Sequence, residues 1–85
     1  MPIVRGQIVR SKAGKDKDTF LVVTEVCENG LRVCDGKDRP IERPKLKNLR
    51  HVSLTNSFLT EEQLSTNRSV RHGLRDFNQS HRGDE

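Results

Sequence analysis

The sequence has 85 residues, 31% hydrophobic and 33% charged, with three Phe and no Trp or Tyr, so it can form one small aliphatic core and no second one. The net charge of +4 is uneven, because residues 1–52 hold twelve Lys or Arg against seven Asp or Glu, while residues 53–85 hold four against five. A positive field on the first part is typical of nucleic-acid binders, although a charge of this size also serves solubility alone.

Two short apolar runs separated by a charged loop organise the first part of the chain. Ile8 and Val9 predict a first strand, and residues 20–26, which are rich in β-branched side chains, predict a second. Because Ile8 and Val9 are adjacent, we expect one to face the core and the other to lie under the loop or the C-terminal segment. Gly14 lies where the chain must reverse among charged neighbours, so we expect a positive φ angle there.

Alternation along the second strand divides its side chains between two faces. We expect the inward face to carry Phe20, Val22, Thr24 and Val26. Leu21 and Val23 would then form an outer apolar strip that needs a cover.

The strongest turn signal is the pair Asn29 and Gly30, which favours a type I′ hairpin. A two-residue turn there would place Val26 opposite Val33 and Cys27 opposite Arg32.

The sequence holds two cysteines, Cys27 and Cys34. In that register they share a face of the sheet but lie diagonally, too far apart for easy bridging. Their spacing also lacks the close ligand pairing of zinc sites, so we expect two reduced thiols and no metal.

Three more short strands complete the predicted barrel. Residues 31–34 form the third, residues 39–42 a fourth that is broken by neighbouring prolines, and residues 49–52 the closing strand, with Leu46 and Leu49 plugging one end. Five short strands joined by tight turns predict a mainly β fold, a small SH3-like barrel over residues 1–52 with a C-terminal helical extension.

The rest of the chain changes character after the barrel. Residues 53–65 are interpreted as a linker and a turn, with Thr60 and Gln63 placed as a capping box. Residues 66–78 predict a helix, and residues 79–85 predict a disordered tail without apolar side chains. The apolar stripe of this helix consists of Val70, Leu74 and Phe77. We expect the helix to form only when docked.

Lys and Arg gather in two candidate phosphate-binding sets. The first surrounds Gly14 and consists of Arg10, Lys12, Lys15 and Lys17. The second consists of Lys37, Arg39, Arg43, Lys45, Lys47 and Arg50. Flexible ammonium groups and the exposed N–H groups of a glycine loop suit phosphate oxygens. In an extended segment, Arg43, Lys45 and Lys47 would form a row spaced at about 7 Å, close to the spacing of phosphates along a strand.

Each set also has a purely structural interpretation. Asp16 and Asp18 lie within the first set and can pair with its lysines, leaving a solvated turn. The second set can protect an edge strand from aggregation. Arg68 and Arg71 on the helix are expected to contribute less, because residues 53–85 carry no net positive charge.

Several function classes are excluded by what the sequence lacks. His51, His72 and His81 are widely separated, and no P-loop, metal-ligand run or apolar pair of carboxylates occurs, so we expect neither an enzyme nor a cofactor. Without Trp or Tyr, a stacking platform for single-stranded bases is also unexpected. The chain contains no secretory h-region and no apolar run near 18 residues, so we expect a cytoplasmic monomer without membrane contact.

Residues 6–26, with Gly14 in the central position, resemble the KOW motif of ribosomal proteins and transcription factors. The run DGKDRPIERPKLKNLRHV, residues 35–52, extends the resemblance to small KOW proteins related to archaeal and eukaryotic large-subunit ribosomal proteins and to their short bacterial relatives. The resemblance covers residues 2–52 and departs from the family at residues 16–19, where many KOW motifs carry a second glycine.

The resemblance implies an RNA-binding protein that uses this loop on structured, ribosomal RNA. A ribosome-associated or translation-related accessory role follows, with ribosomal proteins as further partners. The alternative is a protein-interaction barrel that docks a polypeptide of the transcription or translation machinery on the outer strip, Leu21 and Val23, and on the apolar helix face. If the helix covers the strip within the monomer, this alternative loses its surface.

Overall fold

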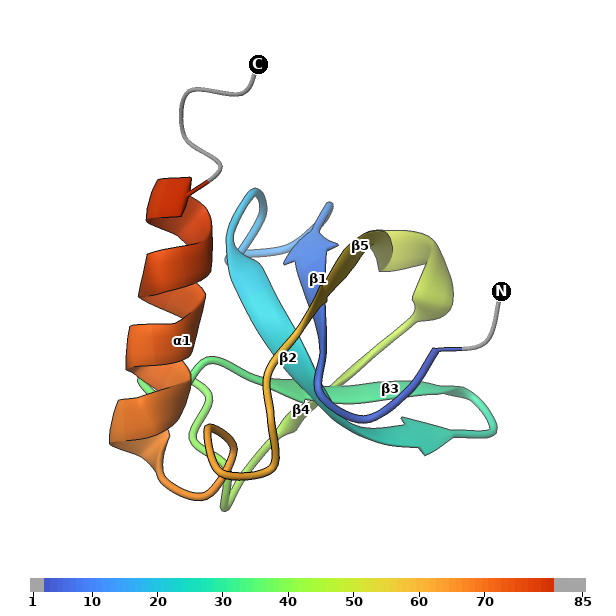
Figure 1. Ribbon diagram of the computed structural model, residues 1–85. Coiled ribbons are helices and arrows are strands. Elements are labelled where there is room, and N and C mark those ends of the chain that lie inside the picture. The colour runs from blue at the N-terminus through green and yellow to red at the C-terminus, as the bar shows by residue number, and fades with distance from the viewer. Residues whose placement is uncertain (1–2, 81–85) are drawn as a thin grey trace.

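A computed structural model describes residues 3–80 as one five-stranded antiparallel sheet with a helix packed on it (Figure 1). The elements are β1 (Gln7–Ser11), β2 (Phe20–Cys27), β3 (Gly30–Cys34), β4 (Lys45–Lys47), the 3-10 turn η1 (Leu49–His51), β5 (Val52–Phe58) and α1 (Asn67–Ser80). The strand order is β4-β3-β2-β1-β5. The expected fold class, a small mainly β barrel with a C-terminal helical extension, is confirmed.

The sheet carries an apolar cluster on each face. The barrel-side cluster consists of Val9, Leu21, Val23, Leu31, Val33 and Val52, with Ile3 packed against it. The helix-side cluster consists of Ile8, Val22, Cys34, Leu59, Leu64, Val70 and Leu74, with Phe20, Ile41 and Phe77 packed against it. As expected, Ile8 and Val9 divide between the two faces.

The predicted facing of β2 is wrong. Leu21 and Val23 lie in the barrel-side cluster, whereas Phe20 and Val22 face the helix, and Val26 is exposed. A strand that is covered on both faces has a continuous apolar sequence instead of an alternating one. The sequence of β2 therefore does not reveal which side chains face the barrel interior.

The β2–β3 hairpin turns one residue earlier than predicted. Cys27 pairs with Gly30 and Val26 with Leu31, and the register shifts between Val23 and Glu25. Asn29 is not among the described residues with positive φ, so a type I′ turn does not form. Gly30 is used instead for close approach, because a Cβ there would meet the Lys47 carbonyl of β4. Both cysteines are free thiols.

The last two strands also differ from the prediction. Residues 39–42 form turns instead of a strand, and the fourth strand is β4. Residues 49–51 form η1, and β5 runs through residues 53–57, where we expected a linker. Leu46 and Leu49 are exposed and do not plug the barrel. The prolines explain the missing strand, because neither Pro40 nor Pro44 can donate a ladder hydrogen bond.

The helical extension follows the prediction closely. Thr60 N donates to Gln63 Oε1 at 2.8 Å and Gln63 N donates to Thr60 Oγ1 at 3.1 Å, which is the expected capping box. Ser69 N donates to Thr66 Oγ1 at 3.0 Å at the start of α1. The helix continues to Ser80, so the first two residues of the predicted tail are helical, and residues 81–85, with His81, lie outside the described part.

α1 docks on the sheet through the predicted stripe. Val70 and Leu74 are buried, and the ring of Phe77 meets that of Phe20 edge-on at 4.9 Å. The described residues contain no helix with the length and apolar character needed to span a bilayer.

Candidate nucleic-acid interface

The loop between β1 and β2 is a defined turn. Gly14 has a φ of 88°, as predicted, and Asp18 has a φ of 71°. Asp18 N donates to Ser11 O at 2.7 Å, and Thr19 N donates to Asp16 O at 3.0 Å. Asp18 thus adopts a left-handed conformation, and Asp is one of the few residues that tolerate it.

Lys47 reaches into this loop from β4. Its side chain is 5% exposed, and its Nζ donates to Asp16 Oδ1 at 3.0 Å and to Ala13 O at 2.7 Å. Ser11 Oγ donates to the same Asp16 oxygen at 2.9 Å. Burial raises the pKa of the Asp16 carboxyl, but the hydrogen bonds from Lys47 and Ser11 outweigh burial and hold this pKa below its ordinary value. Lys47 therefore fixes the loop from inside, and its expected place in an exposed row is wrong.

The second loop aspartate also has a partner. Arg10 Nη2 lies 2.8 Å from Asp18 Oδ1, and both side chains are about half exposed. The two aspartates are thus paired with Arg10 and Lys47, and not with the loop lysines. Lys12, Lys15 and Lys17 are exposed, and their side chains make no hydrogen bond or ion pair within residues 3–80.

The second cationic set is brought beside the first. Asp35 Oδ1 accepts from Lys37 N at 2.8 Å and from Arg39 N at 2.9 Å, which folds this segment into a tight turn. A hollow of about 270 Å³ is lined by both segments. Its lining consists of Lys15, Asp16, Thr19, Asp35, Asp38 and Arg39. Lys15 of the first set and Arg39 of the second therefore face the same space.

The remaining members of the second set are spread from the turn after Pro40 through β4 to η1. Arg43 and Arg50 are exposed, and Lys45 is half-buried on β4. Arg43 N donates to Pro40 O at 3.0 Å, so this residue belongs to a turn and not to a straight row with Lys45. The nearby Glu42 accepts from Asn67 Nδ2 at 2.9 Å, and this bond lowers the pKa of Glu42.

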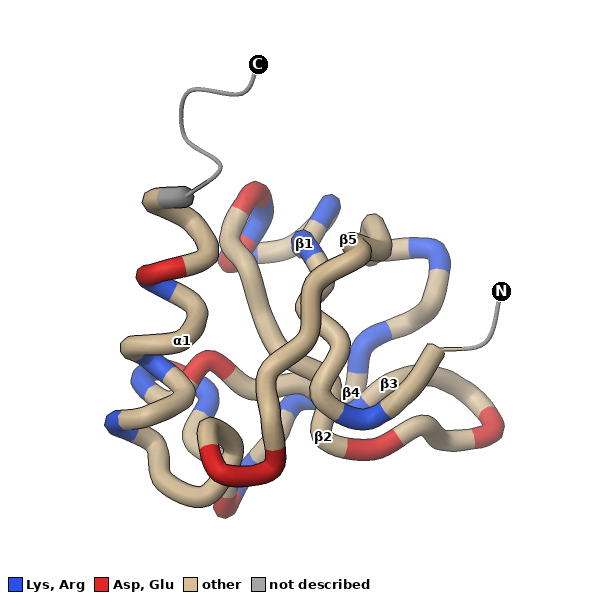
Figure 2. Tube along the Cα trace, in the orientation of Figure 1, with Lys and Arg blue, Asp and Glu red and all other residues tan. Residues whose placement is uncertain are grey.

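The sequence-based prediction missed the arginines of α1 as neighbours of the second set. Arg71 Nη1 donates to Gly36 O at 2.8 Å, which ties α1 to the turn at residues 35–39. Arg68 and Arg75 are exposed on the same helix. Figure 2 shows Lys and Arg positions in blue along α1 and along the segment beside it. The signal was present, because the spacing of residues 68, 71 and 75 places them together on one side of a helix.

The surface required by the protein-interaction alternative is buried. Leu21 and Val23 are 0% exposed, and α1 buries Val70 and Leu74 against the other face of the sheet.

Among residues 3–80, no group of three or more His, Cys, Asp or Glu side chains is arranged to hold a metal ion. No family model matches this sequence, and no curated protein matches it either.

Proposed function

We propose that this protein binds structured RNA, with ribosomal RNA as the favoured class, in a ribosome-associated or translation-related accessory role. The observation that carries the proposal is the pairing of the loop aspartates with Arg10 and Lys47. Within residues 3–80, this pairing leaves Lys12, Lys15 and Lys17 without acidic partners in the loop between β1 and β2. Such a loop presents positive charge outward without internal neutralisation.

Phosphates are the groups that this surface fits best. Lysine ammonium groups act as flexible point charges, which contact phosphates without reading the base sequence. Arg39 lines the same hollow as Lys15, together with Asp16, Asp35 and Asp38, so cations of the two segments lie close together beside acidic side chains. The resemblance of residues 6–26 to the KOW motif supports the same class of partner.

The test is a salt titration of RNA affinity. The variant Lys15→Ala with Lys17→Ala is compared with the parent on a ribosomal RNA hairpin and on an unrelated hairpin of equal length. Because each lost phosphate contact lowers the slope of log affinity against log salt by about 0.7 to 0.9, the slope should fall by about 1.4 to 1.8. Both hairpins should lose affinity to a similar extent, since phosphates carry no sequence.

A matched control removes the same charge elsewhere. Arg5 and Arg32 are already paired, with Glu61 at 3.0 Å and with Glu25 at 3.3 Å. The variant Arg5→Ala with Arg32→Ala should therefore keep most of the slope. If both double variants lose the same RNA affinity and salt slope, the effect comes from net charge, and the loop is rejected as the binding site. If the parent binds no RNA, the proposed function is rejected.

A further inference from the structure

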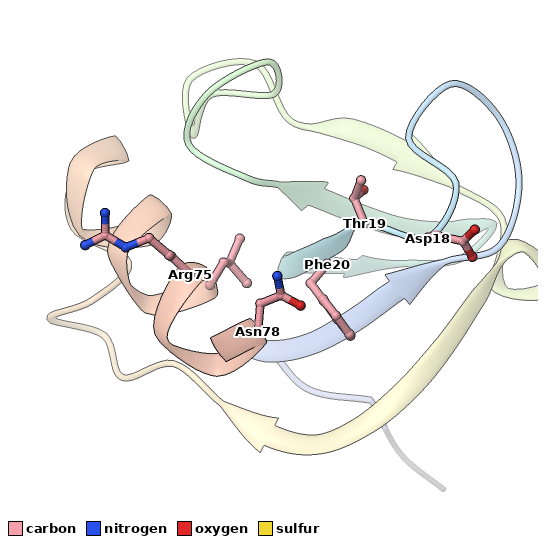
Figure 3. A pocket seen from close by; sticks show the side chains of 6 residues that line it. Asp18, Thr19, Phe20, Arg75 and Asn78 are labelled. Atoms are coloured by element: carbon pink, nitrogen blue, oxygen red, sulfur yellow. The ribbon is translucent and has the colours of Figure 1, made fainter. Parts of the chain in front are cut away.

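A hollow lies between the β1–β2 loop and the C-terminal half of α1. It has a volume of about 320 Å³ (Figure 3). The lining residues are Asp18, Thr19, Phe20, Leu74, Arg75 and Asn78. Because the loop supplies two of them, the hollow is continuous with the surface to which we assign RNA binding.

The walls of the hollow combine apolar surface with hydrogen-bonding groups. Phe20 is half-buried and Leu74 is almost fully buried, so together they form an apolar wall. In Figure 3, the Asn78 amide points toward the space beside Phe20. An amide offers both donors and an acceptor, as the edges of nucleobases require. Thr19 Oγ1 donates to Asp16 O at 2.6 Å, and its oxygen can still accept a hydrogen bond.

One cation, Arg75, lines the hollow. Arg75 is exposed on α1, and no hydrogen bond or ion pair of its side chain is found in the described part of the chain. The Asp18 carboxylate is paired with Arg10 and points away from the helix in Figure 3. A ligand in the hollow would thus meet an apolar wall, one amide and one flanking cation, Arg75.

We propose that this hollow receives one unpaired nucleobase of the bound RNA. The base contacts Phe20 and Leu74, its polar edge bonds to Asn78, and Arg75 contacts the adjoining phosphate. The inference rests on the proposed function, and it adds a preference for RNA in which an unpaired nucleotide adjoins a stem. It gives a role to Arg75, which was not among the helix arginines expected to contribute less, Arg68 and Arg71; Arg71 is engaged with Gly36.

The test uses two RNA hairpins that each carry one 2-aminopurine. In the first hairpin the 2-aminopurine is bulged. In the second hairpin an added nucleotide on the opposite strand pairs with it, and the two hairpins are otherwise the same. The parent should bind the bulged hairpin about tenfold more tightly, as expected for one base held against an aromatic wall. Its 2-aminopurine fluorescence should change on binding. Asn78→Leu keeps a side chain of similar size but removes the amide, so the preference and the fluorescence change should weaken while affinity for the paired hairpin persists.

Gln79→Leu is the matched control, because residue 79 is an exposed neighbour that does not line the hollow. It should behave as the parent. A parent that binds both hairpins equally overturns the inference and leaves the proposed function intact, and a preference retained by Asn78→Leu overturns it as well. A parent that binds neither hairpin overturns the proposed function itself.

Discussion

Gly14 shows how one residue sets the shape of the loop. Its φ of 88° lies in the left-handed region, and a Cβ there would meet Asp16 Oδ1 and Lys47 Nζ only at 3.6 Å. The cost of a side chain is therefore conformational and not steric. Gly14→Val should lower the free energy of unfolding by about 1 to 3 kcal/mol, measured by urea denaturation. Ala13→Val, next to it at ordinary φ, is the control, and an equal loss there would contradict this explanation.

The pair of Lys47 and Asp16 makes stability depend on pH. Removing the partner of a buried carboxylate is costly, so Lys47→Met should lose roughly 3 kcal/mol at pH 7. The folded pKa of Asp16 is depressed, so the pair stabilises the parent above the unfolded pKa of about 4, and this contribution fades as pH falls through the folded pKa. In Lys47→Met, burial without the lysine should raise this pKa instead.

The stability gap between parent and Lys47→Met should therefore narrow between pH 7 and pH 4, as the variant's carboxyl becomes protonated. Denaturant melts at both pH values measure it. The double variant, with Asp16→Asn added, should recover part of the loss at pH 7, and a gap independent of pH would show that the charge of Asp16 is not the cause.

For single residues, the positive φ of Gly14 could be predicted from the sequence, but the buried contact of Lys47 with the loop could not. Gly14 could be predicted because its reason is local, a reversal among charged neighbours. Lys47 occurs in a run of cations with nothing nearby to distinguish it. Its partner lies 31 residues earlier in the chain, so only the folded sheet reveals that this lysine is buried.

Among the elements, we expect α1 to depend on docking more than on its own propensity. Phe77 contacts Phe20 edge-on, and burying a Phe contributes roughly 1.5 to 3 kcal/mol when complete. Phe77→Ala should therefore increase amide exchange throughout residues 67–78. His72→Ala, an exposed change on the same helix, is the control. Unchanged exchange in Phe77→Ala would mean that the helix is held by Val70 and Leu74 alone.

The elements that could be predicted are those with local signals. The capping box of Thr60 and Gln63 and the apolar stripe of α1 are short-range patterns, and both are present in the structure. β5 was missed because its polar sequence resembles a linker. It is a strand because it pairs with β1, and Gln7 Nε2 donates to Thr55 O at 3.0 Å across that pairing.

At the scale of the whole molecule, the sheet separates the helix-side cluster from the barrel-side cluster. β2 contributes Leu21 and Val23 to one cluster and Val22 to the other, so neither cluster can be lost without exposing the same strand. The sequence contained this information in its uninterrupted apolar run. The sequence could not show which side chains of β2 face the helix, because only the position of α1 decides this.

This layering predicts that the helix and the sheet unfold together. Val70 is 0% exposed and belongs to the helix-side cluster, so Val70→Ala should lower the global free energy of unfolding by about 2 kcal/mol through two lost methyl groups and a small cavity. Cys34 reports on the sheet beneath the helix, where burial raises the pKa of its thiol to about 11 and keeps it unreactive. In Val70→Ala, the urea midpoints of circular dichroism and of Cys34 labelling, measured with Cys27→Ser in both proteins, should shift by equal amounts. A shift in labelling alone would mean that α1 detaches from a sheet that remains folded, and the helix would then be an appendage instead of the second layer of one core.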